Sequence, residues 1–129
     1  MNRSLIAAAV LIASLAAAQI ASAYRQPTKE ERAQIVAAIK QRMLKQGDSW
    51  CYGPTTRCAQ ITHIRVSVAN QAFASAAIYK ASVGGALVLL HKVYGTWRVT
   101  EVGSAFVGCD GKAPKAVRID LELACPGGK

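Results

Sequence analysis

The sequence predicts an α+β fold: an N-terminal helix packed on a four-stranded antiparallel meander sheet, then a short C-terminal helix, with two disulfides. Apolar residues recur about every 3.6 residues between positions 29 and 46, and about every second residue after position 60. Short turn signals separate four apolar segments. Because short turns join strands that are neighbours in the sheet, an antiparallel meander is the simplest topology. The helix stripe and one sheet face must bury against each other, so two layers are expected.

The N-terminus has the three-part pattern of a secretory signal peptide. A short positive start, Met1–Ser4, precedes the apolar run Leu5–Ala18, and Ala21-Ser22-Ala23 supplies the small residues of a cleavage site. An uncleaved membrane anchor is the alternative, because the segment is close to the roughly 20 residues needed to span a bilayer. The Ala-x-Ala ending favours cleavage after Ala23, and therefore a secreted or periplasmic protein.

Residues 24–129 are then expected to form a single α+β domain of roughly 100 residues. The whole chain has 16 Lys and Arg against 7 Asp and Glu, a formal charge of +9, and loss of Arg3 would leave +8. In an exported domain this charge favours anionic partners, with an ordinary solvated basic surface as the alternative. No basic-aromatic repeat indicates specific nucleic-acid binding, and no second long apolar run predicts a membrane span in the mature chain.

Four cysteines in an exported chain of this size predict two disulfides. The spacings Cys-x6-Cys and Cys-x15-Cys are typical neither of zinc sites nor of redox motifs, so no metal and no cofactor are predicted. Four cysteines allow three pairings. We favour Cys51–Cys58 and Cys109–Cys125, because each closes a local loop.

The N-terminal helix is predicted over Lys29–Gln46. Thr28 and Glu31 have the spacing of a capping box, and Gly47 follows as a stop signal. Its basic face could contact acidic lipid, although a solvated helix face is the simpler interpretation. The apolar stripe consists of Ile35, Val36, Ile39, Met43 and Leu44.

Four strands follow, separated by Asn70-Gln71, Ser82–Gly85 and Gly95-Thr96. The second strand is rich in alanine, so a helix is an alternative there. The predicted strands are Ile61–Val68, Ala72–Ala81, Ala86–Tyr94 and Trp97–Val102. Ala113-Pro114 then opens a short helix, since proline is favoured at the first helical position.

Two stretches resemble known families. Segments 85–90 (Gly-Ala-Leu-Val-Leu-Leu) and 95–104 (Gly-Thr-Trp-Arg-Val-Thr-Glu-Val-Gly-Ser) resemble the terminal hairpin of cystatin-like and NTF2-like domains, in which a Gly-x-Trp turn joins two strands. The segment Trp97–Cys125 also resembles the ends of small, uncharacterised exported bacterial proteins. The resemblance implies an α+β fold and the pair Cys109–Cys125, and it carries over no catalytic residue.

The residues favour non-catalytic binding over catalysis, and no catalytic residue is predicted. The cysteines are expected to be oxidised, and Gly103-Ser104-Ala105 is not a nucleophile elbow. His63 and His91 both fall in predicted strands, and the few acidic residues form no convergent pair.

Two binding places are predicted. The first is a loop with Trp50, Tyr52 and Arg57, whose residue types are enriched at interfaces, unless they only cover the helix end. The second is a pocket between helix and sheet, whose residues could instead be ordinary core. Its lining would be Phe73, Tyr79, His91, Tyr94 and Trp97. The expected partner is an anionic envelope component or an envelope protein, and the rival hypothesis is a small NTF2-like enzyme or ligand-binding protein acting around His91 and Tyr94.

Overall fold

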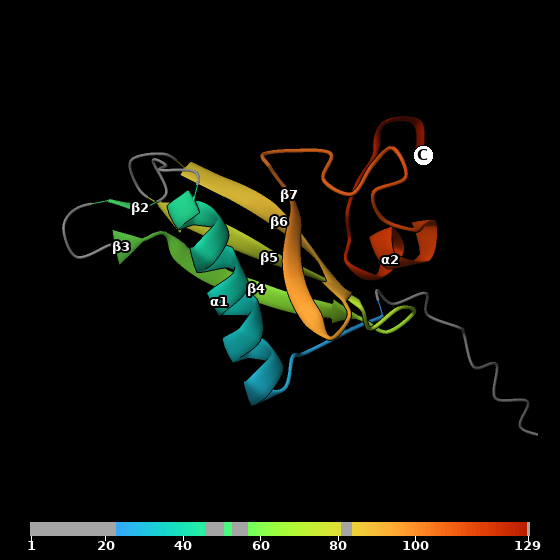
Figure 1. Cartoon of the computed structure of the whole chain (residues 1–129). Coiled ribbons are helices and arrows are strands. Elements are labelled where there is room, and N and C mark those ends of the chain that lie inside the picture. The colour runs from blue at the N-terminus through green and yellow to red at the C-terminus, as the bar shows by residue number, and fades with distance from the viewer. Residues whose placement is uncertain (1–22, 46–50, 53–56, 81–83, 129) are drawn as a thin grey trace, which may run out of the picture.

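The computed structural model describes residues 23–45, 51–52, 57–80 and 84–128 (Figure 1). The predicted signal peptide up to Ser22 lies outside the described residues. Within the described ranges, no helix is long and apolar enough to cross a membrane.

An antiparallel sheet of five strands forms the centre of the fold, in the order β1-β4-β5-β6-β7. Its strands are β1 (Tyr24–Arg25), β4 (Gln60–Ser67), β5 (Phe73–Lys80), β6 (Gly84–Val93) and β7 (Thr96–Gly103). A separate ribbon of two short strands, β2 (Cys51–Tyr52) and β3 (Arg57–Cys58), precedes β4. The four longer strands closely match the predicted ones, and the alanine-rich segment is a strand.

The predicted four-stranded sheet is wrong because β1 adds a fifth strand at one edge. Tyr24 pairs with Ser67 and Arg25 pairs with Val66. The Val68 N–H also donates to the Ala23 carbonyl at 2.9 Å. A strand of two residues has no measurable periodicity, so only its pairing with β4 reveals it.

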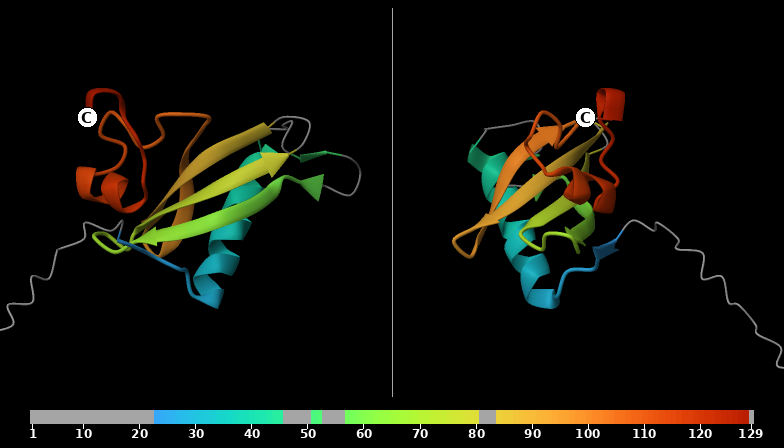
Figure 2. Two further views of the ribbon diagram at one scale, coloured as in Figure 1. Left: turned by 180° about the vertical axis from the view of Figure 1, so that it is seen from behind. Right: turned by 90° about the vertical axis from the view of Figure 1, so that its right-hand side faces the viewer.

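The predicted two-layer arrangement is also wrong, because both faces of the sheet are covered. Helix α1 (Lys29–Lys45) packs on one face, and the C-terminal segment with α2 (Lys115–Asp120) covers the other (Figure 2). Alternating residues of the central strands supply both faces. The α1 face is formed by Ile64, Val66, Ala74, Ala76, Ile78, Val88, Leu90 and Trp97. The opposite cluster contains Phe73, Leu89, Val107, Ala113, Val117, Leu121 and Leu123.

The start of α1 is held by the predicted capping box and by an unpredicted ion pair. The Glu31 N–H donates to Thr28 Oγ1 at 3.1 Å, and the Thr28 N–H donates to Glu31 Oε1 at 3.0 Å. Arg25 of β1 donates to both carboxylate oxygens of Glu31, at 2.7 and 2.8 Å. Arg25 also donates to Gln71 Oε1 at 3.0 Å, so one guanidinium joins the edge strand, the helix and the β4–β5 turn.

One disulfide, Cys109–Cys125, is present among the described residues, with Cα atoms 5.7 Å apart. The prediction of two disulfides is corrected to one whose two side chains are both described, and its pairing is one of the two predicted. Cys58 is also disulfide-bonded. In the β2–β3 ribbon Cys51 lies directly opposite Cys58. The side chain of Cys51 lies outside what the structure describes.

The C-terminal segment, which forms the second covering layer of the sheet, is held to β4 by a buried carboxylate at the end of α2. Asp120 is only 6% exposed. Its Oδ2 accepts hydrogen bonds from the Ser67 hydroxyl at 2.8 Å and from the Ala69 N–H at 2.7 Å. Ser67 itself is fully buried at the end of β4. The sequence predicts the short helix but gives no sign that its last residue binds β4.

Glu31 should make stability depend on pH. Arg25 holds the pKa of Glu31 at about 2, below its ordinary 4.5, by donating hydrogen bonds to the carboxylate; burial opposes this, and the Thr28 N–H adds to it. Because the folded pKa is depressed, this stabilisation is present above about pH 4.5 and is lost as pH falls toward 2. Glu31→Gln should lower the free energy of unfolding by about 1 kcal/mol at pH 7, with the difference shrinking between pH 4.5 and 2.

Denaturant melts at several pH values measure this effect. Glu30→Gln, an exposed neighbour on the same helix turn, is the matched control and should change stability by less than about 0.5 kcal/mol. A pH-independent deficit in Glu31→Gln would contradict the ion-pair explanation.

Asp120→Ala should destabilise the second layer by about 1–3 kcal/mol, because the buried Ser67 hydroxyl and the Ala69 N–H lose their acceptor. Urea unfolding of the oxidised protein measures the loss. The control is Asp110→Asn, at an exposed acid whose left-handed φ of 57° asparagine tolerates. Equal stability of the two variants would show that the buried network contributes nothing.

Candidate functional site

Two adjoining cavities run between α1 and the edge strand β7, and we call them together the α1–β7 groove. Their volumes are about 350 and 330 Å³. The first is lined by Ala38, Gln41, Arg42, Lys45, Thr96, Trp97, Arg98 and Val99. The second is lined by Gln34, Ala37, Ala38, Gln41, Gly95, Thr96 and Trp97. Four shared residues make the two cavities continuous.

Small side chains on α1 leave the space for this groove. The buried stripe of the helix is Ile35, Ile39 and Met43. Ala37 and Ala38 lie beside that stripe, and their single methyl groups reach only a short way toward β7. Because β7 is the last strand of the sheet, no further strand fills the space beside it in the described structure.

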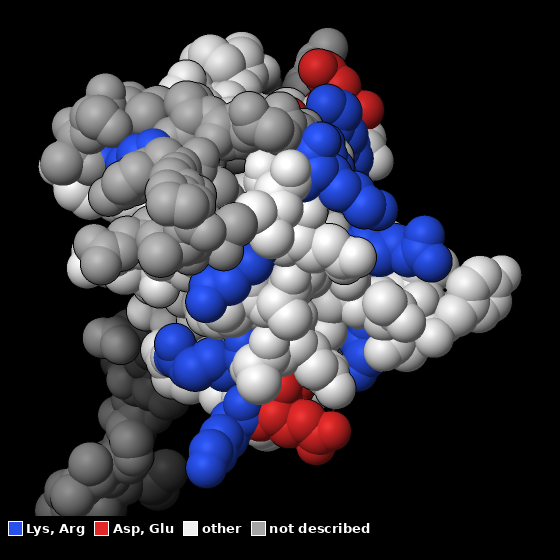
Figure 3. Space-filling view, turned by 60° about the vertical axis from the view of Figure 1, so that its left-hand side comes forward, with Lys and Arg blue, Asp and Glu red and all other residues white. Residues whose placement is uncertain are grey.

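The groove is lined by three cations and by no acidic residue. These are Arg42, Lys45 and Arg98. Arg42 donates to the Val99 carbonyl at 3.1 Å, which fixes it against the β7 edge. Lys45 and Arg98 are exposed and have no side-chain partner in the described ranges. Lys and Arg spread along this side of the molecule, with Asp and Glu confined to its upper and lower ends (Figure 3).

Trp97 lines both cavities, and its buried indole N–H is unpaired in the described structure. The residue is only 4% exposed and belongs to the α1 core cluster. Its indole N–H has no hydrogen-bond partner among the described residues. Buried donors are nearly always paired, so an unpaired one calls for an explanation. The Lys92 ammonium lies 5.7 Å from the centre of the Trp97 ring, which adds another positive charge near the groove.

Tyr94, which precedes the groove residue Gly95 in the β6–β7 turn, has an unfavourable backbone conformation. It has φ 49° and Gly95 has φ 76°, so both turn residues of the β6–β7 hairpin lie in the left-handed region. Two-residue hairpin turns of this kind favour Asn-Gly, and a bulky residue there is strained. The Tyr94 side chain is fully exposed, so packing within the described domain does not offset that strain.

The structure does not bring the five predicted pocket residues around one cavity. Phe73 and His91 stack on the face opposite α1, with ring centroids 4.1 Å apart and planes 6° from parallel. Trp97 lies on the α1 face, and Tyr79 and Tyr94 are exposed. These five residues therefore do not line one cavity in the described structure, because strand alternation sends them to different faces. The space between α1 and the sheet holds the described core cluster instead.

The predicted binding loop lies largely outside the described residues. Trp50 is not described, and only the backbone of Tyr52 and Arg57 is, where the two residues pair directly across the β2–β3 ribbon. Their proposed role in binding a partner stays a prediction.

Several carboxylates already have structural partners. Glu101 accepts from the Gly108 N–H at 2.8 Å and lies 3.4 Å from Lys112 Nζ. Glu122 pairs with Arg65 at 3.0 Å. Among the described residues, no group of His, Cys, Asp and Glu has an arrangement that could hold a metal ion.

No protein-family model, curated protein or solved structure matches this chain. The resemblance of segments 85–90 and 95–104 to cystatin-like and NTF2-like domains, and that of Trp97–Cys125 to small exported bacterial proteins, therefore stay sequence-based predictions. Function has to be inferred from the geometry alone.

Of the five predicted pocket residues, Trp97 alone lines the groove, and the sequence assigned it to another cavity. It missed Arg42, Lys45 and Arg98. Arg42 and Lys45 are three residues apart on a predicted helix, a spacing that places them on one face. Nothing in the sequence shows that this face lies beside β7.

Proposed function

We propose that this protein is a non-catalytic binding domain of the cell envelope whose α1–β7 groove holds an acidic polysaccharide. The observation that carries the proposal is a continuous groove lined by Arg42, Lys45 and Arg98 and by no acidic residue. Cations in such a cleft attract anions and raise their local concentration.

The polar lining suits a sugar chain better than a bare anion. Gln34 and Gln41 offer amide donors and acceptors, and Thr96 offers a hydroxyl, all of which can hydrogen-bond to sugar hydroxyls. Arg98 and Lys45 can pair with the acid groups of the polymer. The exposed ring of Tyr94, next to Gly95 at the rim, provides a flat surface for a sugar ring.

Export is part of the same proposal. The Cys109–Cys125 disulfide is consistent with an oxidising environment outside the cytosol. Together with the signal-peptide pattern of residues 1–23, it supports a periplasmic or secreted location, where acidic polysaccharides are accessible.

Removing two groove charges should weaken binding to an acidic polysaccharide. Lys45→Gln/Arg98→Gln should raise the Kd for polygalacturonate about three- to tenfold at low salt, because each exposed ion pair contributes about 0.2–1 kcal/mol. Isothermal titration calorimetry measures the change. The matched control is Lys29→Gln/Lys40→Gln, which removes two exposed charges from the same helix outside the groove.

The choice of ligands tests the proposal further. Neutral dextran should bind much more weakly than polygalacturonate, and polyphosphate, which has the charge but no sugar, should bind less tightly. Equal weakening by the two double variants would show diffuse attraction instead of a groove site. Tighter binding of polyphosphate would contradict recognition of a sugar chain.

Tyr94→Asn should increase stability and decrease binding. Asparagine tolerates the left-handed conformation, so the free energy of unfolding should rise by about 0.5–1 kcal/mol. Loss of the exposed ring should weaken polygalacturonate binding a few-fold. Tyr94→Phe, which keeps the ring and the strain, should leave both quantities close to wild type. A Tyr94→Asn protein that binds with full affinity would remove Tyr94 from the site.

A further inference from the structure

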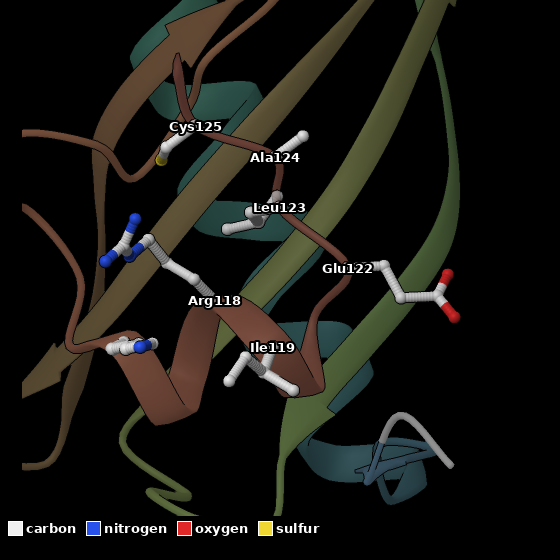
Figure 4. A pocket seen from close by; sticks show the side chains of 7 residues that line it. Arg118, Ile119, Glu122, Leu123, Ala124 and Cys125 are labelled. Atoms are coloured by element: carbon white, nitrogen blue, oxygen red, sulfur yellow. The ribbon is translucent and has the colours of Figure 1, made fainter. Parts of the chain in front are cut away.

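A third cavity lies in the C-terminal layer, formed by α2 and the segment that returns along it (Figure 4). We call it the α2 pocket. Its volume is about 360 Å³, within the range of small-molecule sites. Its lining is Lys115, Arg118, Ile119, Glu122, Leu123, Ala124 and Cys125. None of these residues lines the α1–β7 groove, so the observations here are independent of the proposed polysaccharide site.

The walls of the α2 pocket are mainly hydrocarbon. Ile119 is a large apolar side chain that stays 50% exposed. Leu123, Ala124 and the disulfide-bonded Cys125 continue the apolar surface along the returning segment. The methylene stems of Lys115 and Arg118 add to it, since long basic side chains commonly cover apolar surface with their stems.

Arg118 brings an unsatisfied cation into these apolar surroundings. Its Nε atom is buried and has no hydrogen-bond partner among the described residues. In Figure 4 its side chain extends from α2 toward Cys125. A buried guanidinium nitrogen without an acceptor is costly, and a bound anion would remove that cost.

The acidic residue of the pocket does not neutralise Arg118. The Glu122 carboxylate points away from Arg118 (Figure 4) and pairs with Arg65 of β4 at 3.0 Å. Lys115, one turn before Arg118 on α2, contributes a second positive charge and has no side-chain partner in the part of the chain that is described. The pocket therefore offers two cations above an apolar wall.

We propose that the α2 pocket binds an alkyl carboxylate. The carboxylate accepts two parallel hydrogen bonds from the Arg118 guanidinium, a geometry that this planar group favours. The alkyl chain lies along Ile119 and Leu123, where it removes apolar surface from water. Both parts of the ligand contribute, so neither a short carboxylate nor an alcohol of the same chain length should bind as well.

The oxidised protein is titrated with octanoate, and the chemical shifts of its backbone amides are measured at each step. Saturable shifts should be confined to residues 115–125 and their neighbours, with a Kd on the order of 0.1–1 mM for so few ligand atoms. Octanol and acetate should each bind at least tenfold more weakly. Shifts that centre on Gln41 and Thr96 would place the ligand in the groove and overturn the proposal.

Arg118→Met keeps an unbranched apolar stem and removes the guanidinium with its charge. It should weaken octanoate binding about tenfold while leaving polygalacturonate binding unchanged. Lys29→Met, an exposed charge on α1, is the control and should have no effect. If Arg118→Met does not fold, comparing the affinities of octanoate, octanol and acetate for the wild-type protein still tests the proposal. Octanol binding as tightly as octanoate, or no saturable binding of octanoate, overturns the proposal.

Discussion

The five-stranded sheet has apolar side chains on both faces, and each face needs a cover that excludes water. Helix α1 covers one face with a single apolar stripe, Ile35, Ile39 and Met43. The C-terminal segment covers the other, fastened by the buried Asp120 at one end and by the Cys109–Cys125 disulfide at the other. The α1–β7 groove is a consequence of this arrangement, because it lies where α1 meets the edge strand β7. The α2 pocket lies within the C-terminal covering segment itself.

Pairing of the acidic residues determines the electrostatic character of the surface. Glu31, Glu101, Asp120 and Glu122 each bind a specific donor or cation within the fold. These acids are therefore not placed to neutralise the groove or Arg118 of the α2 pocket. The chain has 16 basic residues against 7 acidic ones, and three of the basic residues, Arg42, Lys45 and Arg98, line the α1–β7 groove.

The helix and the four long strands could be predicted because each is long enough for its hydrophobic period to be measured. Strand β1 has two residues and no period of its own. The candidate groove could not be predicted either, since Lys45 and Arg98 are far apart in the sequence and meet only because α1 packs beside β7. Phe73 and Trp97 looked like partners in one pocket, yet strand alternation places them on opposite faces.

The sequence by itself determined the α+β class, the helix with its Thr28–Glu31 cap, the four long strands and the excess of positive charge. All of these depend on composition or on neighbours within a few residues. The tertiary structure decided the fifth strand, the second covering layer and the positions of the cations. Those features depend on which residues meet across the sheet, such as Ser67 with Asp120. Such pairings cannot be predicted from the local sequence, because they form only when the apolar faces are buried together.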